Sequence, residues 1–347
     1  MNILGIESSC DETSVAILTD GEVKANLISS QLFHKQFGGV VPELSSRAHL
    51  QQIIPLIKKA LQQSEISADE LDVISATAGP GLIGALLVGL TFGKSLALAL
   101  NKPFISVNHI EGHIFSGFLM ENKPEFPFIC TVVSGGHTLL LLVKSSFEII
   151  KLGSTIDDAI GEAFDKVSKM IGLGYPGGPL IQKYAEQGDE NSIQFPIAKC
   201  KNKYDMSFSG LKTAVLRYIQ KKKFDKQISE KDKSNIAASF QKAATQAIIQ
   251  KVNLALDENK INSLSLVGGV AANKKLRNEF YKIGQHKNIK IVIPKIEYCG
   301  DNAAMIAYRG MQYYKAGKTY TLSSNAYPGL PTDVFLRRTE NNLKTDN

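Results

Sequence analysis

Hydrophobic residues recur along this chain in short continuous runs that end at polar or glycine-rich turns. Two such runs within residues 2–18 are separated by a polar turn at 8–13, a pattern that predicts a β-hairpin at the start of the chain. Two further runs within residues 128–143 are separated by a glycine-rich turn at 134–138. A hairpin that recurs after about one domain length predicts an internal duplication.

A second pair of matching elements supports the duplication. An apolar strand pattern at 71–77 leads into a glycine-rich turn at 78–81, and another at 263–267 leads into a similar turn at 268–273. Each turn is followed by a helical pattern. Because glycine has no side chain to obstruct an approaching ligand, backbone amides at both turns could bind an anion. We therefore expect an α/β protein of two lobes, with a nucleotide or acyl-phosphate site between them.

One apolar stretch, residues 82–100, needs a membrane test. It contains a single charge, Lys94, over nearly the length of a spanning helix. It also contains three glycines, at 84, 89 and 93, of which the last two have the G-x-x-x-G spacing that can mark membrane helix pairs. No other stretch is similarly apolar, and no cluster of basic residues flanks it, so we expect a helix buried between a sheet and a neighbour, and no membrane.

Composition narrows the class of protein. With 347 residues, of which 44% are hydrophobic, the chain can form two packed domains. Its four cysteines are widely separated, which favours neither disulfides nor a thiolate metal site and suits a reducing cytoplasm. Residues 1–6 have the pattern of a strand and not of a secretory signal.

The charge of the chain favours an anionic partner. The formal net charge is +7 and the pI is about 9.0, which makes nucleic acid the first candidate, with an ordinary basic protein as the alternative. The most basic segment, residues 199–235, also contains Tyr204, Phe208 and Tyr218. Lysines with interleaved aromatic residues suit RNA phosphates and unstacked bases, although a solvated helical insertion has the same composition.

The strongest candidate for chemistry is a pair of histidines. Asn108 follows an apolar run and is a candidate helix cap, so His109 and His113 would lie four residues apart on one helix face, as two ligands of one metal ion. Two partly buried histidines are the alternative. A zinc protease has glutamate directly after its first histidine, whereas Glu111 lies about 200° around the helix from His109. Asp301 begins a later helix, as its cap or as the third ligand.

Acidic residues elsewhere are candidates for binding and proton transfer. Asp158, Glu162 and Asp165 have helical spacing, and a glycine-proline turn at 172–179 follows them, so Asp165 could bind ribose hydroxyls. Asp11 and Glu12 lie in the first hairpin turn, where we expect them to face the metal. Two histidines, one carboxylate and open coordination positions are typical of non-haem iron(II), with zinc as the alternative.

These motifs together resemble a known family. Its signature is matched by Lys94-Ser95, Pro103 and the His-Ile-Glu-Gly-His run at 109–113, and its other blocks by residues 5–13, 133–138, 267–273 and 300–302. The chain resembles the tRNA N6-adenosine threonylcarbamoyltransferases, formerly described as O-sialoglycoprotein endopeptidases. The resemblance covers roughly residues 1–320.

The resemblance implies two duplicated ribonuclease-H-like lobes, similar to actin, sugar kinases and Hsp70, with the active site in the cleft between them. We expect residues 1–108 to form the first lobe, to which a helix at about 302–322 returns. Residues 109–301 would form the second lobe, with the lysine-rich insertion at 199–235. Residues 323–347 would be a mobile tail.

The implied reaction transfers a threonylcarbamoyl group from threonylcarbamoyl-adenylate to N6 of the adenosine adjacent to the anticodon, in tRNAs that read codons starting with A, and releases AMP. Residues matching the family's metal ligands are His109, His113 and Asp301, which would hold one iron(II), or zinc, per subunit. We assign Asp11 or Glu12 to removal of the N6 proton. The residues implied to bind the adenylate are Val132, Val133, Ser134, Gly135, Gly136, Asp165, Gly178 and Asn273, with His137 as an additional candidate.

The family also implies partners in the cytoplasm: tRNA, an enzyme that makes the adenylate, a small ATPase, and a paralogous subunit without activity that pairs with the first lobe. Three other functions compete. A kinase or ATPase of this fold would not need two histidines on one helix. A metallopeptidase would need a general base near the metal. A binding protein with a degenerate cleft would not be expected to keep the glycine turns, both histidines and Asp301.

Overall fold

The first part of the chain is built on a five-stranded sheet in the order β3-β2-β1-β4-β5. Strands β1, β2 and β3 form an antiparallel meander, and β4 and β5 run parallel to β1. The opening hairpin predicted from the apolar runs is therefore present, with one further strand. The strands are β1 (Asn2–Glu7), β2 (Glu12–Thr19), β3 (Glu22–Ser30), β4 (Val73–Gly79) and β5 (Phe104–Asn108).

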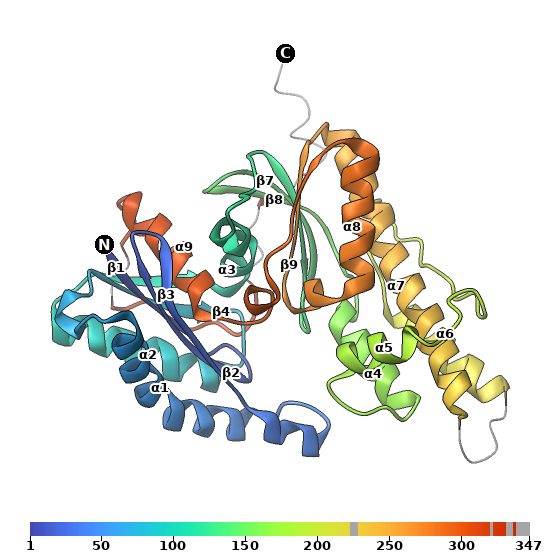
Figure 1. Ribbon diagram of the computed structural model, residues 1–347, viewed down its shortest axis with the longest axis horizontal. Helices are drawn as coiled ribbons and strands as arrows, with labels where there is room; N and C mark the ends of the chain where they lie inside the picture. The colour runs from blue at the N-terminus through green and yellow to red at the C-terminus, as the bar shows by residue number, and fades with distance from the viewer. Residues whose placement is uncertain (223–227, 320–321, 331–335, 338–347) are drawn as a thin grey trace. The chain divides into compact units, whose positions relative to one another are not determined.

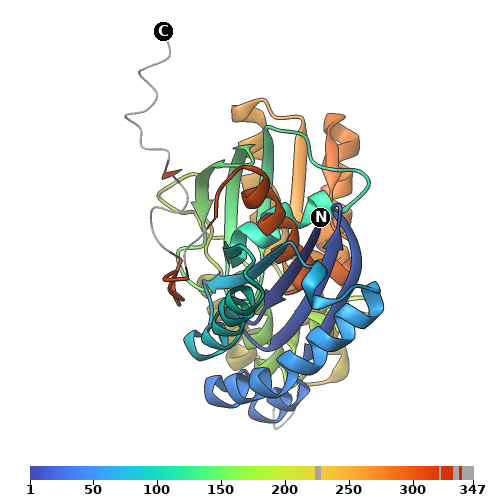
Figure 2. The ribbon, with the colours of Figure 1, turned by 90° about the vertical axis from the view of Figure 1, so that its left-hand side faces the viewer.

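Helices cover both faces of this sheet (Figure 1). Helices α1 (Pro42–Ser64) and α2 (Ile83–Leu100) lie side by side on one face, as Figure 2 shows. The opposite face is covered by α9 (Ala303–Lys315), against which α3 (His109–Ser116) packs. Successive side chains of a strand point to opposite faces, so β1 contributes to both layers.

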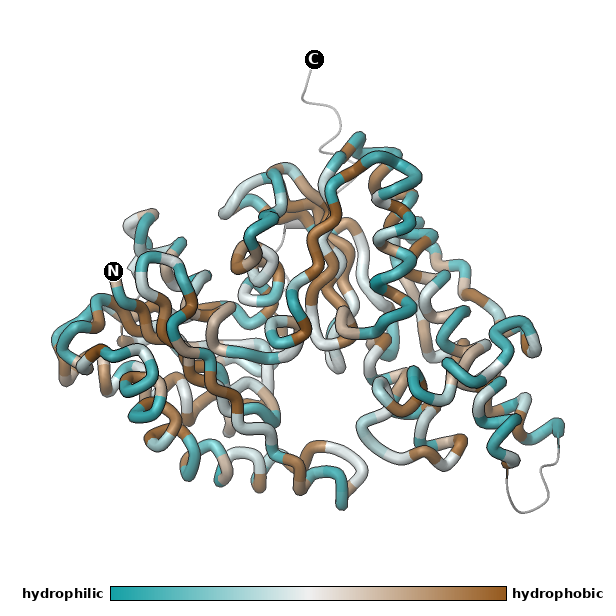
Figure 3. Tube along the Cα trace, in the orientation of Figure 1, coloured by the Kyte–Doolittle hydropathy of each residue, from teal (hydrophilic) through white to brown (hydrophobic). Residues whose placement is uncertain are grey.

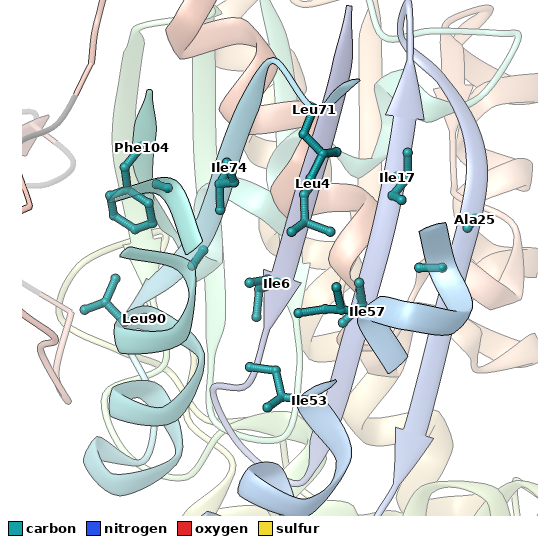
Figure 4. Close-up of a cluster of buried hydrophobic side chains, with 14 of the residues drawn as sticks. Leu4, Ile6, Ile17, Ala25, Ile53, Ile57, Leu71, Ile74, Leu90 and Phe104 are labelled. Carbon is teal, nitrogen blue, oxygen red and sulfur yellow. The ribbon is translucent and has the colours of Figure 1, made fainter. Parts of the chain in front are cut away.

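The core of this sheet lies between its strands and α1 and α2 (Figure 4). Leu4 and Ile6 of β1 meet Ile53 and Ile57, which are four residues apart on α1 and therefore lie on one side of that helix. A fully buried leucine or isoleucine stabilises a fold by about 1.5–3 kcal/mol. Figure 3 shows the corresponding pattern, with hydrophobic strands and hydrophilic outer helix faces.

The second part of the chain repeats this arrangement in a six-stranded sheet with the order β10-β9-β6-β7-β8-β11. Strands β6, β7 and β8 form an antiparallel meander, and β9 and β10 run parallel to β6 and to each other. The internal duplication predicted from the sequence is therefore confirmed in the strand order. The strands are β6 (Phe128–Val133), β7 (Thr138–Ser145), β8 (Glu148–Ser154), β9 (Ser263–Val267), β10 (Lys290–Val292) and β11 (Leu336–Arg337).

The longest helix of the second part, α7 (Glu230–Asn259), packs on β6 and on α5, α6 and α8. Its apolar period predicted a helix at 236–256. The observed helix begins earlier because the Ser229 side chain caps it by accepting a hydrogen bond from the Asp232 amide at 3.1 Å. The other helices are α4 (Ile160–Met170), α5 (Gly177–Ala185), α6 (Ser209–Lys221) and α8 (Lys274–Lys287).

The structure, a computed structural model, describes residues 1–222, 228–319, 322–330 and 336–337. It divides into two compact units, which are Met1–Lys123 with Pro294–Val334, and Pro124–Ile293 with Phe335–Asn347. Short 3-10 helices occur at Leu32–Phe37, Ala68–Glu70, Gly117–Leu119, Gly269–Ala272 and Ile296–Tyr298.

The division differs in position from the boundaries expected from sequence. Residues 109–123 belong to the first unit, since α3 packs against α9 there, although we expected the second lobe to begin at 109. Helix α9 corresponds to the helix expected at 302–322. Of the tail expected at 323–347, residues 331–335 and 338–347 lie outside the described residues, as do residues 223–227 of the insertion.

Helix α2 is the only described helix that is long and apolar enough to cross a membrane, which is weak evidence because core helices pass the same test. Its glycines allow the helix backbone to lie close to the sheet. A methyl carbon at Gly89 would lie 2.3 Å from the Ser8 hydroxyl, and one at Gly93 would lie 3.1 Å from Cβ of Ala76. The prediction that α2 packs on a sheet is confirmed for the face of the helix that carries Gly89 and Gly93.

We predict that Gly93→Leu lowers the free energy of unfolding by about 1–3 kcal/mol, because the added side chain overpacks the contact with Ala76 and Phe104. Urea denaturation followed by circular dichroism measures this change. Ser95→Leu, at an exposed position of the same helix, is the control and should change stability by less than about 0.5 kcal/mol. Equal stability of both variants would contradict the close approach of α2 to the sheet.

Candidate active site

Helix α3 begins where β5 ends, and Asn108 caps it. The Asn108 side chain accepts hydrogen bonds from the amides of Ile110 at 2.9 Å and Glu111 at 3.1 Å, so the predicted cap is confirmed. All eight residues of α3 are buried. The rings of His109 and His113 lie on one side of this helix, with their centroids 4.7 Å apart.

Asp301 lies against this pair of histidines. Its Oδ1 is 3.1 Å from Nε2 of His113 and 3.5 Å from Nε2 of His109. The cap of α9 is not Asp301 but Asn302, whose side chain accepts a hydrogen bond from the Met305 amide at 3.1 Å. The interpretation of Asp301 as the helix cap is therefore wrong, and its role as a metal ligand stays a prediction.

Glu7 is a member of this site that the sequence did not single out. Its Oε2 lies 3.0 Å from Nδ1 of His109, and the carboxylate also accepts hydrogen bonds from the Ser9 amide and the Thr77 hydroxyl, both at 2.6 Å. A proton on Nδ1 directed at Glu7 leaves the Nε2 lone pair of His109 directed toward Asp301. Metal-ligating histidines commonly have such a carboxylate partner. The sequence signal that could have identified Glu7 is a charged residue at the end of an apolar strand.

The electrostatics of the site are dominated by buried carboxylates. Burial alone would lower the pKa of His109, but Glu7 and Asp301 raise it to about 9. Burial, followed by Asp301 and Asp11, raises the pKa of Glu12 to about 10. Burial would raise the pKa of Glu7, yet the charge and hydrogen bond of His109 lower it overall. This accumulation of negative charge favours binding of a cation.

The donor set fits a divalent transition metal. One atom each of His109, His113 and Asp301 lie within 4.8 Å of one another, and these three form the group of potential ligands found among the described residues. Two imidazole nitrogens and one carboxylate oxygen suit iron(II) or zinc. The Glu7 carboxylate behind His109 adds the supporting hydrogen bond that such sites have.

Asp11 lies in the turn between β1 and β2, and Glu12 is the first residue of β2. Helix α1 holds this turn in place. Ser45 and His49 of α1 both contact the Cys10 carbonyl oxygen, at 2.5 and 3.0 Å. His49 is buried, and its Nδ1 lies 2.7 Å from the hydroxyl of Thr13. Asp301 raises the pKa of Glu12, so Glu12 lies within the electrostatic influence of a residue that contacts both histidines.

The glycine-rich turn after β6 lies in the second unit, at the start of α4. The Ser134 amide donates to the His137 carbonyl at 2.8 Å, and the His137 amide donates to the Ser134 hydroxyl at 3.1 Å. Gly135 and Gly136 are exposed, and a Cβ on either would meet no atom within 4 Å. Val132 and Val133 are fully buried in β6, so only their backbone is available to a ligand.

Asp165, Gly178 and Asn273 also lie in the second unit. The Asp165 carboxylate accepts a hydrogen bond from the Gly177 amide at 2.6 Å, and this contact joins α4 to the start of α5, beside Gly178. Asn273 caps α8 and donates to the Gln241 side chain at 2.8 Å. Asp165 and Asn273 therefore have protein partners that fix the positions a ligand would meet.

The glycine turn at 78–81 does not bind an anion as its sequence suggested, because a later segment of the chain covers it. A Cβ on Gly79, whose φ is +152°, would lie 2.1 Å from the Tyr327 carbonyl oxygen. The Gly81 amide donates to the Pro328 carbonyl at 3.1 Å, and the Tyr327 amide donates to the Ala78 carbonyl at 2.9 Å. The glycines here allow close approach of the chain to itself.

Two aromatic residues of the basic segment are also placed differently from the RNA-stacking hypothesis. Phe208 is fully buried and Tyr204 is 4% exposed. Both are therefore core residues and cannot stack on bases. Tyr218 is partly exposed and contacts the ring of Phe195.

Comparison with known proteins identifies the family of this chain. A sequence model of the family described as tRNA N6-adenosine threonylcarbamoyltransferase matches residues 22–308. The protein of that name from Thermosipho africanus is 52% identical over 332 residues, covering 95% of this chain and 99% of the relative. Its counterpart from Chloroherpeton thalassium is 51% identical, covering 88% of this chain and 90% of the relative.

The chain belongs to the tRNA N6-adenosine threonylcarbamoyltransferase family. It is therefore a transferase, of the acyltransferase class. The resemblance carried by the sequence motifs is confirmed.

Solved structures of distant proteins share the fold. HypF from T. kodakarensis superimposes with a TM-score of 0.63 at 14% identity, covering 94% of this chain and 50% of HypF. The activator of 2-hydroxyisocaproyl-CoA dehydratase from Clostridium difficile superimposes with a TM-score of 0.52 at 14% identity, covering 92% and 97%. The predicted fold class, two duplicated lobes like those of actin, sugar kinases and Hsp70, is confirmed.

We predict that replacing any one of His109, His113 and Asp301 by alanine removes bound iron or zinc from the purified protein, because two remaining donors bind a divalent ion weakly. Metal content per chain, measured by inductively coupled plasma mass spectrometry, checks this. His286→Ala, which removes an exposed histidine of the second unit, should leave the metal content unchanged. Full metal content in the Asp301→Ala variant would refute the assignment of that ligand.

Proposed function

We propose that this protein transfers the threonylcarbamoyl group from threonylcarbamoyl-adenylate to N6 of the adenosine adjacent to the anticodon, in tRNAs that read codons starting with A. The observation that carries the proposal is the buried cluster of His109, His113 and Asp301, supported by Glu7, in a chain of this family. The proposal accounts for the basic net charge through the polyanionic substrate.

His109, His113 and Asp301 would hold the metal, with iron(II) as the first choice because a two-histidine, one-carboxylate set with open positions is typical of it. When bound, the metal supplies a Lewis acid that polarises an acyl or phosphoryl oxygen. Glu7 keeps His109 in the tautomer whose Nε2 is available as a ligand. Zinc is the alternative ion.

The proton of the attacking amine needs an acceptor, and Asp11 or Glu12 is assigned to it. As N6 forms its bond to the carbamoyl carbon, the bond from that carbon to the phosphate oxygen breaks, AMP leaves, and one N6 proton goes to the carboxylate. Burial, followed by the charge of Asp301, raises the pKa of Glu12 to about 10, so Glu12 is protonated at neutral pH. Neutralising Asp301 removes one cause of this shift and favours the ionised form, which can accept a proton.

The second unit is assigned to the adenylate. Gly135 and Gly136 belong to the turn after β6, which lies beside the start of α4. Their exposed backbone suits a phosphate group. Val132 and Val133 would contribute backbone atoms, Asp165 would bind the ribose, and Gly178 and Asn273 complete the set, with His137 as an additional candidate.

The tRNA is assigned to the basic segment of the second unit. Its exposed cations include Lys199, Lys201, Arg217, Lys221 and Lys222. Because the aromatic residues Tyr204 and Phe208 are buried, the contacts expected are with phosphates. Binding through these residues should therefore weaken steeply with salt.

A protein partner is assigned to the outer face of α1 and α2. Five large apolar residues are exposed on these adjacent helices, at 46–68% of their surface: Leu50, Ile54, Ile83, Leu87 and Leu98. An apolar face of this extent is typical of a protein interface. We assign it to the paralogous subunit. A small ATPase, an upstream enzyme that makes the adenylate, and a cytoplasmic location complete the proposal.

We predict that the protein, assayed with its partner subunits and threonylcarbamoyl-adenylate, modifies an unmodified anticodon stem-loop, as measured by mass spectrometry of the nucleosides. His109→Ala or Asp301→Ala should reduce the rate by about 100-fold or more, because loss of Lewis-acid stabilisation is worth several kcal/mol. His286→Ala should react at the unaltered rate. Transfer at the unaltered rate by the Asp301→Ala variant, or magnesium-dependent phosphorylation of a small molecule, would refute the proposal, and the second result would favour a kinase.

We predict that Leu87→Glu weakens association with the paralogous subunit by about 10-fold or more, because a charge would be buried in the apolar interface. Isothermal titration calorimetry with the purified subunit measures the dissociation constant. Ser95→Glu, at another exposed position of α2, is the matched control for adding the same charge. An unchanged dissociation constant for Leu87→Glu would remove α2 from the interface.

A further inference from the structure

Glu111 lies between the two histidines in the sequence, on the opposite side of α3. Its carboxylate oxygen Oε2 accepts hydrogen bonds from Nε of Arg309 at 2.7 Å and from the Tyr313 hydroxyl at 2.7 Å, and Nη2 of Arg309 lies at 2.6 Å. Arg309 is 1% exposed, so this is a buried ion pair. The alternative role for Glu111, the general base of a metallopeptidase, is excluded by these contacts, because the carboxylate is occupied on the side away from His109 and His113.

Arg309 is itself held by two aromatic rings and by hydrogen bonds. The group lies 4.2 Å from the ring centroid of Phe115 on α3 and 4.3 Å from that of Tyr313 on α9, and its Nη1 donates to Gln312 at 2.9 Å. A planar cation with two ring contacts and several directed hydrogen bonds has one orientation. The pair therefore fixes the position of α3 along α9, and its rotation relative to α9.

The same two helices carry the candidate ligands. His109 and His113 belong to α3, and Asp301 lies directly before the Asn302 cap of α9. The helices approach closely, because a Cβ on Gly112 would lie 2.9 Å from Cδ1 of Ile306. A shift of α3 along α9 would therefore change the distances from both histidines to Asp301.

The two histidines differ in how they are oriented. His109 is held by Glu7 through Nδ1, whereas Nδ1 of His113 is buried and has no hydrogen-bond partner among the described residues. No hydrogen bond from behind the ring of His113 thus sets its orientation. Its position depends on the rotation of α3, and Glu111 controls this rotation from the opposite side of the helix.

We propose that Glu111 is a positioning residue for the metal centre, acting with Arg309 to hold α3 so that His113 and His109 meet Asp301 at ligand distance. The inference rests on the metal site proposed above. It assigns to Glu111 a function in metal affinity and coordination geometry that is separate from its contribution to stability.

Cobalt(II) binding to the full-length protein tests this inference, because the visible absorption of cobalt reports both affinity and coordination geometry. Glu111→Gln keeps the shape of the side chain and removes its charge. We expect its cobalt affinity to be about 10–100-fold weaker, as for other residues that orient metal ligands, with an altered absorption band. Arg309→Lys keeps the positive charge but loses the two-nitrogen contact, and should show an intermediate loss of affinity.

The control separates position from stability. Ile57→Ala lowers stability through the core of the same unit, on the sheet face away from α9, and should leave both cobalt affinity and spectrum unchanged. Failure of the wild-type chain to bind cobalt would overturn the metal site and this inference with it. Wild-type cobalt affinity and spectrum in the Glu111→Gln variant would overturn this inference and leave the metal site standing. If Glu111→Gln does not fold, the cobalt affinity and spectrum of Arg309→Lys provide the same test.

Discussion

The packing of α9 on the first sheet is the contact on which the candidate site depends. The chain leaves the first unit after Lys123 and returns at Pro294, and α9 then lies directly on β1. The contact is so close that a Cβ on Gly5 would lie 2.4 Å from the Ala303 carbonyl oxygen. The Ala303 amide also donates to the Ser14 hydroxyl of β2 at 2.9 Å. These contacts place Asp301, just before the helix, against His109 and His113.

Buried charge is the second constraint. The Glu7 carboxylate is paired with His109 and Glu111 with Arg309, so the acids on both sides of α3 have partners. An unpaired charge in such surroundings would cost several kcal/mol. Burial, followed by the charges of Asp301 and Asp11, raises the pKa of Glu12. The carboxylates of Glu7 and Asp301 beside the two histidines account for the fit of the site to a divalent ion.

The sequence predicted the duplicated sheets well because local patterns carry that information. Apolar runs with polar turns define β1 with β2 and β6 with β7, and Asn108 caps α3 through atoms two and three residues away. Predictions that required knowledge of distant neighbours failed. The glycines at 78–81 resembled an anion-binding turn, but their space is taken by Tyr327, and the aromatic side chains of Tyr204 and Phe208 are buried in the core.

By itself the sequence determined the two-lobed fold, the family and the three candidate ligands, because these follow from local periodicity and from motifs of fixed spacing. Only the tertiary structure decided which groups support those ligands. Glu7 is 102 residues from His109, and Arg309 is 198 residues from Glu111, so no local pattern connects them. A carboxylate at a strand end or within a helix has the same sequence signal whether it faces solvent or a buried partner, and only the packing of α3 against the sheet and against α9 distinguishes the two.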